Sequence, residues 1–135
     1  MINQIFVNLH VKDLDKARDF YTKLGFTINE QFSDHTAACV VMSDHIFVML
    51  LTHDKFKQFT PKEISDATKT SEVLNALSVE NRDEVNKMVD AAIEAGGSEA
   101  RPEEDHGFMF SRAFNDLDGH IWEIFHMDMS AIPEN

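Results

Sequence analysis

The chain has 135 residues, 43% of them hydrophobic and 27% charged, which is typical of one compact globular domain rather than a disordered segment. Its 24 acidic residues outnumber the 12 Lys and Arg residues and give a net charge of −12. Phosphate backbones and anionic bilayers repel such a chain, so nucleic acid and membranes are not expected partners.

The single cysteine, Cys39, excludes an intramolecular disulfide, and its apolar neighbours predict a buried thiol. The first residues, Met-Ile-Asn-Gln-Ile-Phe, lack the basic region and apolar stretch of a signal peptide. No apolar run approaches the length of a membrane span. We therefore expect a cytoplasmic protein.

The first predicted strand covers residues 4–11 and has two unlike faces. One face carries branched aliphatic side chains, and the other carries Phe6, Asn8 and His10. A uniformly apolar face is typical of packing against helices, whereas a mixed face is typical of a strand that borders a pocket. The second face is therefore the candidate binding face.

A helix and three strands follow in the first half. The helix is predicted from Asp13, its N-cap, to Gly25, its stop signal. The strands are predicted at residues 26–32, 36–42 and 46–52. The next segment breaks this pattern, and its Thr-Pro-Lys-Glu sequence at 60–63 predicts a short helix or lid.

The second half repeats this order. A strand at 73–79 precedes a helix that Asn81 caps and a Gly-Gly pair ends, and strands are predicted near residue 99, at 108–114 and at 120–127. The repeat predicts module one at 1–55, a connector at 56–71, module two at 72–129 and a tail at 130–135. The predicted fold is α+β: paired βαβββ modules forming a curved eight-stranded cup with helices outside.

Two motifs at opposite ends of the chain resemble one known superfamily. They are Asn-Leu-His-Val-Lys-Asp-Leu at 8–14 and Phe-Asn-Asp-Leu-Asp-Gly-His-Ile-Trp-Glu at 114–123. In order and spacing they look like the vicinal-oxygen-chelate proteins, which include glyoxalases, bleomycin-resistance proteins and extradiol dioxygenases. The resemblance covers nearly the whole chain and implies paired βαβββ modules, homodimers and, in the enzymes, a divalent ion that holds two vicinal substrate oxygens.

The resemblance also implies four metal-ligand positions, generally His or Glu. They match Phe6, Leu50 (or Val48, which the internal repeat favours), Leu74 and Glu123. Only Glu123 is a ligand type, and one carboxylate supplies at most two of the donors that an ion needs. We therefore expect no metal and no other cofactor.

Several residues are candidates for a binding site in the cup. Glu123 is the candidate ligand-orienting or acid/base group. Its apolar surroundings favour the neutral carboxyl unless a cation pairs with it. The alternative is that Glu123 is a family residue without a function here, held by a structural ion pair or hydrogen bonds. Arg112 is the candidate partner of Glu123 or of an anionic ligand group, with a surface ion pair as the alternative. The remaining candidate ligand-binding residues are Phe6, Asn8, His10, Leu50, Leu74, Phe108, Phe110 and Phe125.

Three functions are compatible with these residues. The leading hypothesis is a bleomycin-resistance-like protein that holds a small apolar or aromatic molecule in a metal-free cup, with its acidity suited to a cationic guest. The alternative is a metal-dependent glyoxalase-type lyase or dioxygenase with non-standard ligands drawn from Asn8, His10 and Glu123. The third is a metal-free isomerase or lyase that uses Glu123 as a base.

Overall fold

A computed structural model describes residues 1–132 of the chain, so the last three residues of the predicted tail lie outside the described part. The chain divides into two compact units, Met1–Asp66 and a second that begins at Ala67. The boundary falls within the predicted connector at 56–71. No helix within residues 1–132 is long and apolar enough to cross a membrane.

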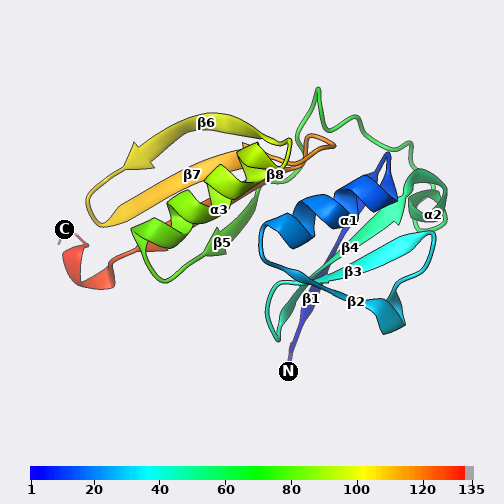
Figure 1. Cartoon of the computed structure of the whole chain (residues 1–135), viewed down its shortest axis with the longest axis horizontal. Helices are drawn as coiled ribbons and strands as arrows, with labels where there is room; N and C mark the ends of the chain where they lie inside the picture. The colour runs from blue at the N-terminus through cyan, green and yellow to red at the C-terminus, as the bar shows by residue number, and fades with distance from the viewer. Residues whose placement is uncertain (133–135) are drawn as a thin grey trace. The chain divides into compact units, whose positions relative to one another are not determined.

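The first unit is one βαβββ module (Figure 1). Its elements in chain order are β1 (Ile5–Val11), α1 (Leu14–Lys23), β2 (Thr27–Asn29), a 3-10 turn η1 (Glu30–Phe32), β3 (Ala37–Val41), β4 (Ile46–Thr52) and α2 (His53–Lys57). The sheet order is β1-β4-β3-β2, with β1 parallel to β4 and the other neighbours antiparallel. Helix α1 packs on β2, β3 and β4.

Helix α1 forms for the reasons predicted from its sequence. The Asp13 side chain accepts a hydrogen bond from the Lys16 backbone N–H and so caps the first turn. The buried positions Leu14, Ala17, Phe20 and Tyr21 form one stripe along the helix. This stripe and the buried aliphatic residues of β1, β3 and β4 make up the core of the first unit.

The second unit repeats the module (Figure 1). It contains β5 (Asn75–Ser78), α3 (Arg82–Glu94), β6 (Ser98–Asp105), β7 (Met109–Asn115), β8 (Ile121–Met127) and a 3-10 turn η2 (Met129–Ala131). The sheet order is β5-β8-β7-β6, with β5 parallel to β8. Asn81 caps α3 as predicted, since its side chain accepts from the Glu84 backbone N–H. The α+β fold of paired βαβββ modules is confirmed.

Two local predictions were wrong. Residues 60–63 form a bend rather than a helix, and Thr60 Oγ accepts a hydrogen bond from the Lys62 N–H there. The helix of this segment, α2, lies earlier, directly after β4, and the Thr52 side chain caps it. The strand predicted at 26–32 ends at Asn29, whose side chain accepts from the Gln31 N–H and starts η1. At Asn29 a local side-chain cap ends the strand that the wider hydrophobic pattern predicts.

Candidate functional site

The sheet of the second unit buries one face under α3 and leaves the opposite face, the open face, uncovered by that helix. Trp122 and Ile124 of β8 are 2% and 0% exposed and belong to the core on the α3 side. Because successive side chains in a strand alternate, Glu123 and Phe125 lie on the open face. The neighbouring strand follows the same rule, with Phe114 buried on the core side and Ser111 on the open face.

Two irregularities in the edge strand β6 change the direction of its side chains. Glu99 pairs with Phe114 and Arg101 with Ala113, so two steps along β6 match one step along β7. Such a bulge turns Arg101 onto the open face although Glu99 faces α3. A second register shift lies between Arg101 and Glu104 and brings the Glu104 side chain back beside Arg101. Pro102 lies between them, in the edge-strand position where proline is tolerated.

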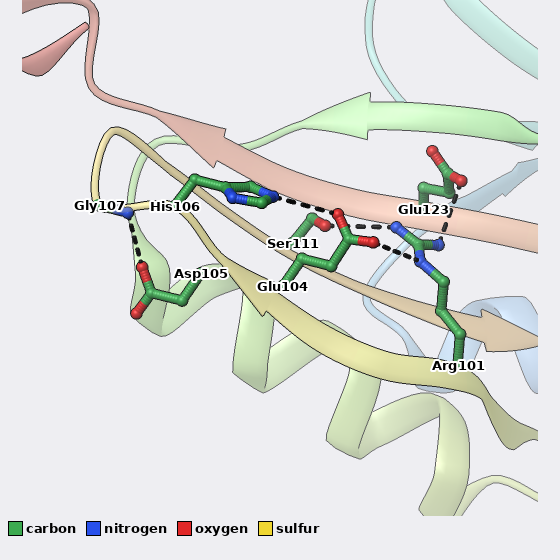
Figure 2. Close-up of polar contacts among 7 residues, drawn as sticks. All are labelled: Arg101, Glu104, Asp105, His106, Gly107, Ser111 and Glu123. Carbon is green, nitrogen blue, oxygen red and sulfur yellow. Dashed lines mark hydrogen bonds and ion pairs between the residues drawn. The ribbon is translucent and has the colours of Figure 1, made fainter. Parts of the chain in front are cut away.

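The bulged strand brings a guanidinium to Glu123 (Figure 2). Arg101 Nη1 donates to Glu123 Oε1 at 3.1 Å, and Arg101 Nη2 donates to Ser111 Oγ at 3.3 Å. The Nε of Arg101 lies 3.8 Å from Oε1 of Glu104, whose other oxygen is 3.4 Å from His106 Nε2. The side chains of Arg101 and Glu123 are 31% and 25% exposed, so this ion pair is half-buried.

This pair forms part of the lining of a cavity of about 570 Å³ on the open face. Most of the lining is apolar, and the polar groups gather around Arg101. The apolar lining residues are Leu74, Ala76, Ala100, Met109, Ile121, Phe125 and Met127. Of the predicted site residues, the structure therefore brings Leu74, Glu123 and Phe125 together.

The ion-pair partner of Glu123 differs from the prediction. Arg112 lies on the α3 side of β7, where it contacts Asp90, Asn86 and Glu99. Arg112 pairs with Asp90 and Glu99, and its own side chain is only 11% exposed, so it is more buried than the predicted surface ion pair implies. The expected Arg112–Glu123 pair is therefore wrong. The reason is strand parity, because Arg112 and Ser111 are consecutive and must face opposite sides.

Phe108 and Phe110 also lie away from this cavity. Phe110 is 5% exposed and packs under the Arg82 guanidinium, 5.0 Å from the ring centroid. Both phenylalanines border a smaller depression of about 340 Å³ beside the start of α3. The prediction that Phe108 and Phe110 line the same cavity as Phe125 is therefore wrong.

In the first unit the counterpart of Glu123 is Met49. Asn8 in the first unit and Ala76 in the second occupy equivalent positions, because each lies five residues before the N-cap of the following helix. Asn8 pairs with Met49 on the parallel neighbouring strand, and Ala76 pairs with Glu123. Leu50, like Val48, is 0% exposed and belongs to the core of the first unit, which corrects its expected place in the cup wall. The corrected position is as apolar as the predicted one.

The remaining predicted residues lie on the open face of the first sheet. Phe6 stacks on Phe47 at 4.6 Å between ring centroids, and Asn8 is exposed. His10 is 7% exposed and meets the rings of His53 and Phe56 edge-on. His10 is therefore buried under α2 rather than placed at a rim.

The described residues offer no ready metal site. Nowhere in residues 1–132 do three or more His, Cys, Asp or Glu side chains gather closely enough to hold an ion. At the position that the resemblance assigns to a carboxylate ligand, the Arg101 guanidinium already neutralises Glu123. A divalent ion placed there would be repelled by the guanidinium. The donor set therefore does not fit the superfamily's metal.

Sequence reasoning missed Arg101, Ser111 and Glu104. In a regular strand, alternate side chains point to the same face, so the sequence predicts which face each residue occupies. The bulges of β6 interrupt this alternation. The only signal was Pro102, a residue that in a strand indicates an edge or a bulge.

Comparisons with known proteins agree with this architecture. Residues 4–43 match the family model of the bleomycin resistance protein-like N-terminal region. No curated protein matches the chain. A solved hypothetical protein from S. aureus shares 29% identity over 93% of this chain and 94% of its own, with a TM-score of 0.78.

Two further solved structures share the fold at lower identity. A glyoxalase/bleomycin resistance protein/dioxygenase family enzyme from Burkholderia phytofirmans has 17% identity, a TM-score of 0.74 and coverage of 90% of this chain and 96% of its own. A glyoxalase-related enzyme from Fulvimarina pelagi has 20% identity, a TM-score of 0.78 and coverage of 93% and 88%.

The paired βαβββ modules have the same fold as these glyoxalase-related structures. The N-terminal family model and the two sequence motifs support the same resemblance to the vicinal-oxygen-chelate superfamily.

Proposed function

We propose that the protein binds a small apolar or aromatic molecule in the open-face cavity of the second unit, without a metal ion. The observation that carries this proposal is the cavity of about 570 Å³ with an apolar wall and one polar cluster, Arg101, Glu123, Ser111 and Glu104. Pockets for small molecules typically measure about 300–1,000 Å³ and combine apolar walls with a few convergent polar groups.

The chemistry of the ligand positions supports the metal-free part of the proposal. Three of the four positions are hydrocarbon or thioether side chains, Phe6, Met49 and Leu74. The fourth is Glu123, which Arg101 neutralises. An ion would have to displace a guanidinium to gain a single carboxylate, which is an unfavourable exchange.

The test is a thermal-shift screen of neutral and charged aromatic compounds in buffer with chelator, followed by calorimetric titration of each hit. Ala76→Phe fills the cavity and is expected to abolish binding, because Ala76 lines it from β5. The control is Lys87→Phe, which adds the same ring at an exposed position of α3. Hits that bind both variants equally, or that bind only when a divalent ion is added, would refute the proposal.

We also propose that the protein is a homodimer, as its resemblance to the superfamily implies. Sedimentation equilibrium at several concentrations tests this separately from ligand binding. A mass corresponding to two chains of 15.4 kDa is expected, and a single-chain mass at all concentrations would contradict it.

A further inference from the structure

Two of the seven methionines line the open-face cavity, and they lie on neighbouring strands. Met109 of β7 and Met127 of β8 are direct partners in the antiparallel pairing, so their Cβ atoms lie about 4.5–5.5 Å apart. Both side chains are half-buried, in contrast to Met129, which is 71% exposed just after β8. The cavity therefore presents two adjacent thioether side chains to its ligand.

The thioethers are the most readily oxidised groups of the cavity wall. Peroxides convert a methionine thioether into a sulfoxide, and a thiol reacts with them only as its thiolate. The single cysteine, Cys39, does not compete for an oxidant, because it is 1% exposed and burial raises the pKa of its thiol. A peroxide bound in the cavity therefore meets Met109 and Met127 as its reactive groups.

The apolar wall selects the kind of peroxide. A hydroperoxide with an apolar body buries that body in the cavity, whereas hydrogen peroxide has no apolar surface to bury. Binding then holds the O–O bond beside the two side chains at a high effective concentration. Building on the proposed function, we infer that Met109 and Met127 form a modification site for organic hydroperoxides with a single aromatic ring, and that their oxidation weakens binding of apolar ligands in the cavity.

The oxygen transfer needs no further reactant. The methionine sulfur attacks the terminal oxygen of the hydroperoxide, so an S–O bond forms as the O–O bond breaks. The proton of the terminal oxygen passes to the departing oxygen, and the products are methionine sulfoxide and an alcohol. The sulfur loses two electrons, which the peroxide bond gains.

Oxidation changes an apolar part of the wall into a polar one. The sulfoxide oxygen loses its contacts with water when an apolar ligand fills the cavity, and this desolvation opposes binding. The affinity for an apolar ligand should therefore fall about tenfold or more. Methionine sulfoxide can be reduced back to methionine, so the change is reversible.

The test compares cumene hydroperoxide with hydrogen peroxide, in EDTA to suppress radical chemistry from trace metals. Peptide mass spectrometry follows each methionine. Cumene hydroperoxide should oxidise Met109 and Met127 at least about tenfold faster than Met129, although Met129 is far more exposed. Hydrogen peroxide should reverse this order, because exposure then decides the rate. Excess 2-phenyl-2-propanol, the alcohol product, should protect the cavity pair but not Met129.

Two variants assign the loss of binding to this pair. Met109→Leu/Met127→Leu replaces both thioethers with side chains of similar volume. Its affinity for 2-phenyl-2-propanol should be the same before and after treatment with cumene hydroperoxide, whereas that of the wild type should fall about tenfold. The control, Met129→Leu, removes an exposed thioether outside the cavity lining and should lose affinity on treatment as the wild type does.

The outcomes separate the inference from the function beneath it, because methyl NMR measures binding of 2-phenyl-2-propanol independently. If this alcohol binds in the cavity, three results would each overturn the inference and leave cavity binding intact: faster oxidation of Met129 by cumene hydroperoxide, no protection by the alcohol, or unchanged affinity after oxidation of the pair. If the alcohol shifts no cavity methyl signal at millimolar concentrations, the proposed function is overturned together with the inference.

Discussion

Leu50 and Leu74 both match superfamily ligand positions in the sequence, yet their environments are opposite. Leu50 is 0% exposed in the first core, whereas Leu74 is 55% exposed and lines the cavity. Consecutive residues of a strand face opposite sides of the sheet. The superfamily position falls on Met49, and an alignment shifted by one residue assigns it to Leu50, which faces the core. The apolar character of the position was predictable from the sequence, but its exact register was not.

This contrast predicts different effects of the same substitution. Leu50→Ala should lower the free energy of unfolding by about 2–5 kcal/mol, because it leaves a cavity in a packed core. Leu74→Ala should lower it by less than about 1 kcal/mol, since half of the side chain is already exposed, but should weaken ligand binding. Urea denaturation and ligand titration of both variants check this, and a large stability loss in the Leu74 variant alone would contradict the assignment.

Asp105 predicts a pH dependence at the tip of the β6–β7 hairpin. Hydrogen bonds from Arg82, and then from the Gly107 backbone, lower the pKa of the Asp105 carboxyl from 3.8 to about 2. A depressed folded-state pKa contributes stability above the unfolded pKa, and this contribution disappears as the pH falls from about 4 through 2.

Asp105→Asn should therefore lose stability at neutral pH and become less sensitive to acid in that window. Unfolding free energies of both proteins measured between pH 2 and pH 7 test this. Curves that stay parallel across the acid range would show that Asp105 makes no such contribution.

At the scale of the element, the turn between β7 and β8 depends on Gly119. Its φ is +90°, and a Cβ at this position would lie 2.7 Å from the Ala67 carbonyl oxygen. Gly25, which ends α1, has a similar φ of +104° but no atom within 4 Å of the added Cβ. Substituting Gly25 tests the cost of backbone strain alone, whereas substituting Gly119 adds a steric clash to that strain.

Gly25→Ala should cost roughly 1 kcal/mol from the unfavourable φ alone. Gly119→Ala should cost more, about 2–4 kcal/mol, since the backbone at Ala67 must also move. Thermal and urea unfolding of the two variants measure the difference. Equal losses of unfolding free energy in the two variants would mean that the backbone at Ala67 moves aside without an energetic cost.

The elements themselves were largely predictable, and the exceptions have physical causes. Amphipathic periodicity and caps identify α1 and α3, because Asp13 and Asn81 are the N-caps observed. Strand β6 was located only approximately, and its bulges decide that Arg101 rather than Arg112 meets Glu123. A bulge depends on pairing with β7, which a period-two pattern in one strand does not contain.

At the scale of the whole molecule, the net charge of −12 attracts cations weakly at the surface without creating a specific ion site. Protein purified without chelator should therefore contain well under one equivalent of divalent metal after desalting. Adding nickel, zinc, manganese or iron should leave the melting temperature unchanged. Elemental analysis and thermal unfolding check both points, and one tightly held equivalent would favour the metal-dependent lyase or dioxygenase.

The most direct test of the central claim is a methyl NMR titration of the wild-type protein with its best screening hit in the presence of EDTA. The methyl signals of Leu74, Met109, Ile121 and Met127, which line the cavity, should shift together and saturate, while those of the core residues Val48 and Leu50 stay in place. If no methyl shifts in EDTA, and the cavity signals respond only after a divalent ion is added, metal-free binding in this cavity is contradicted.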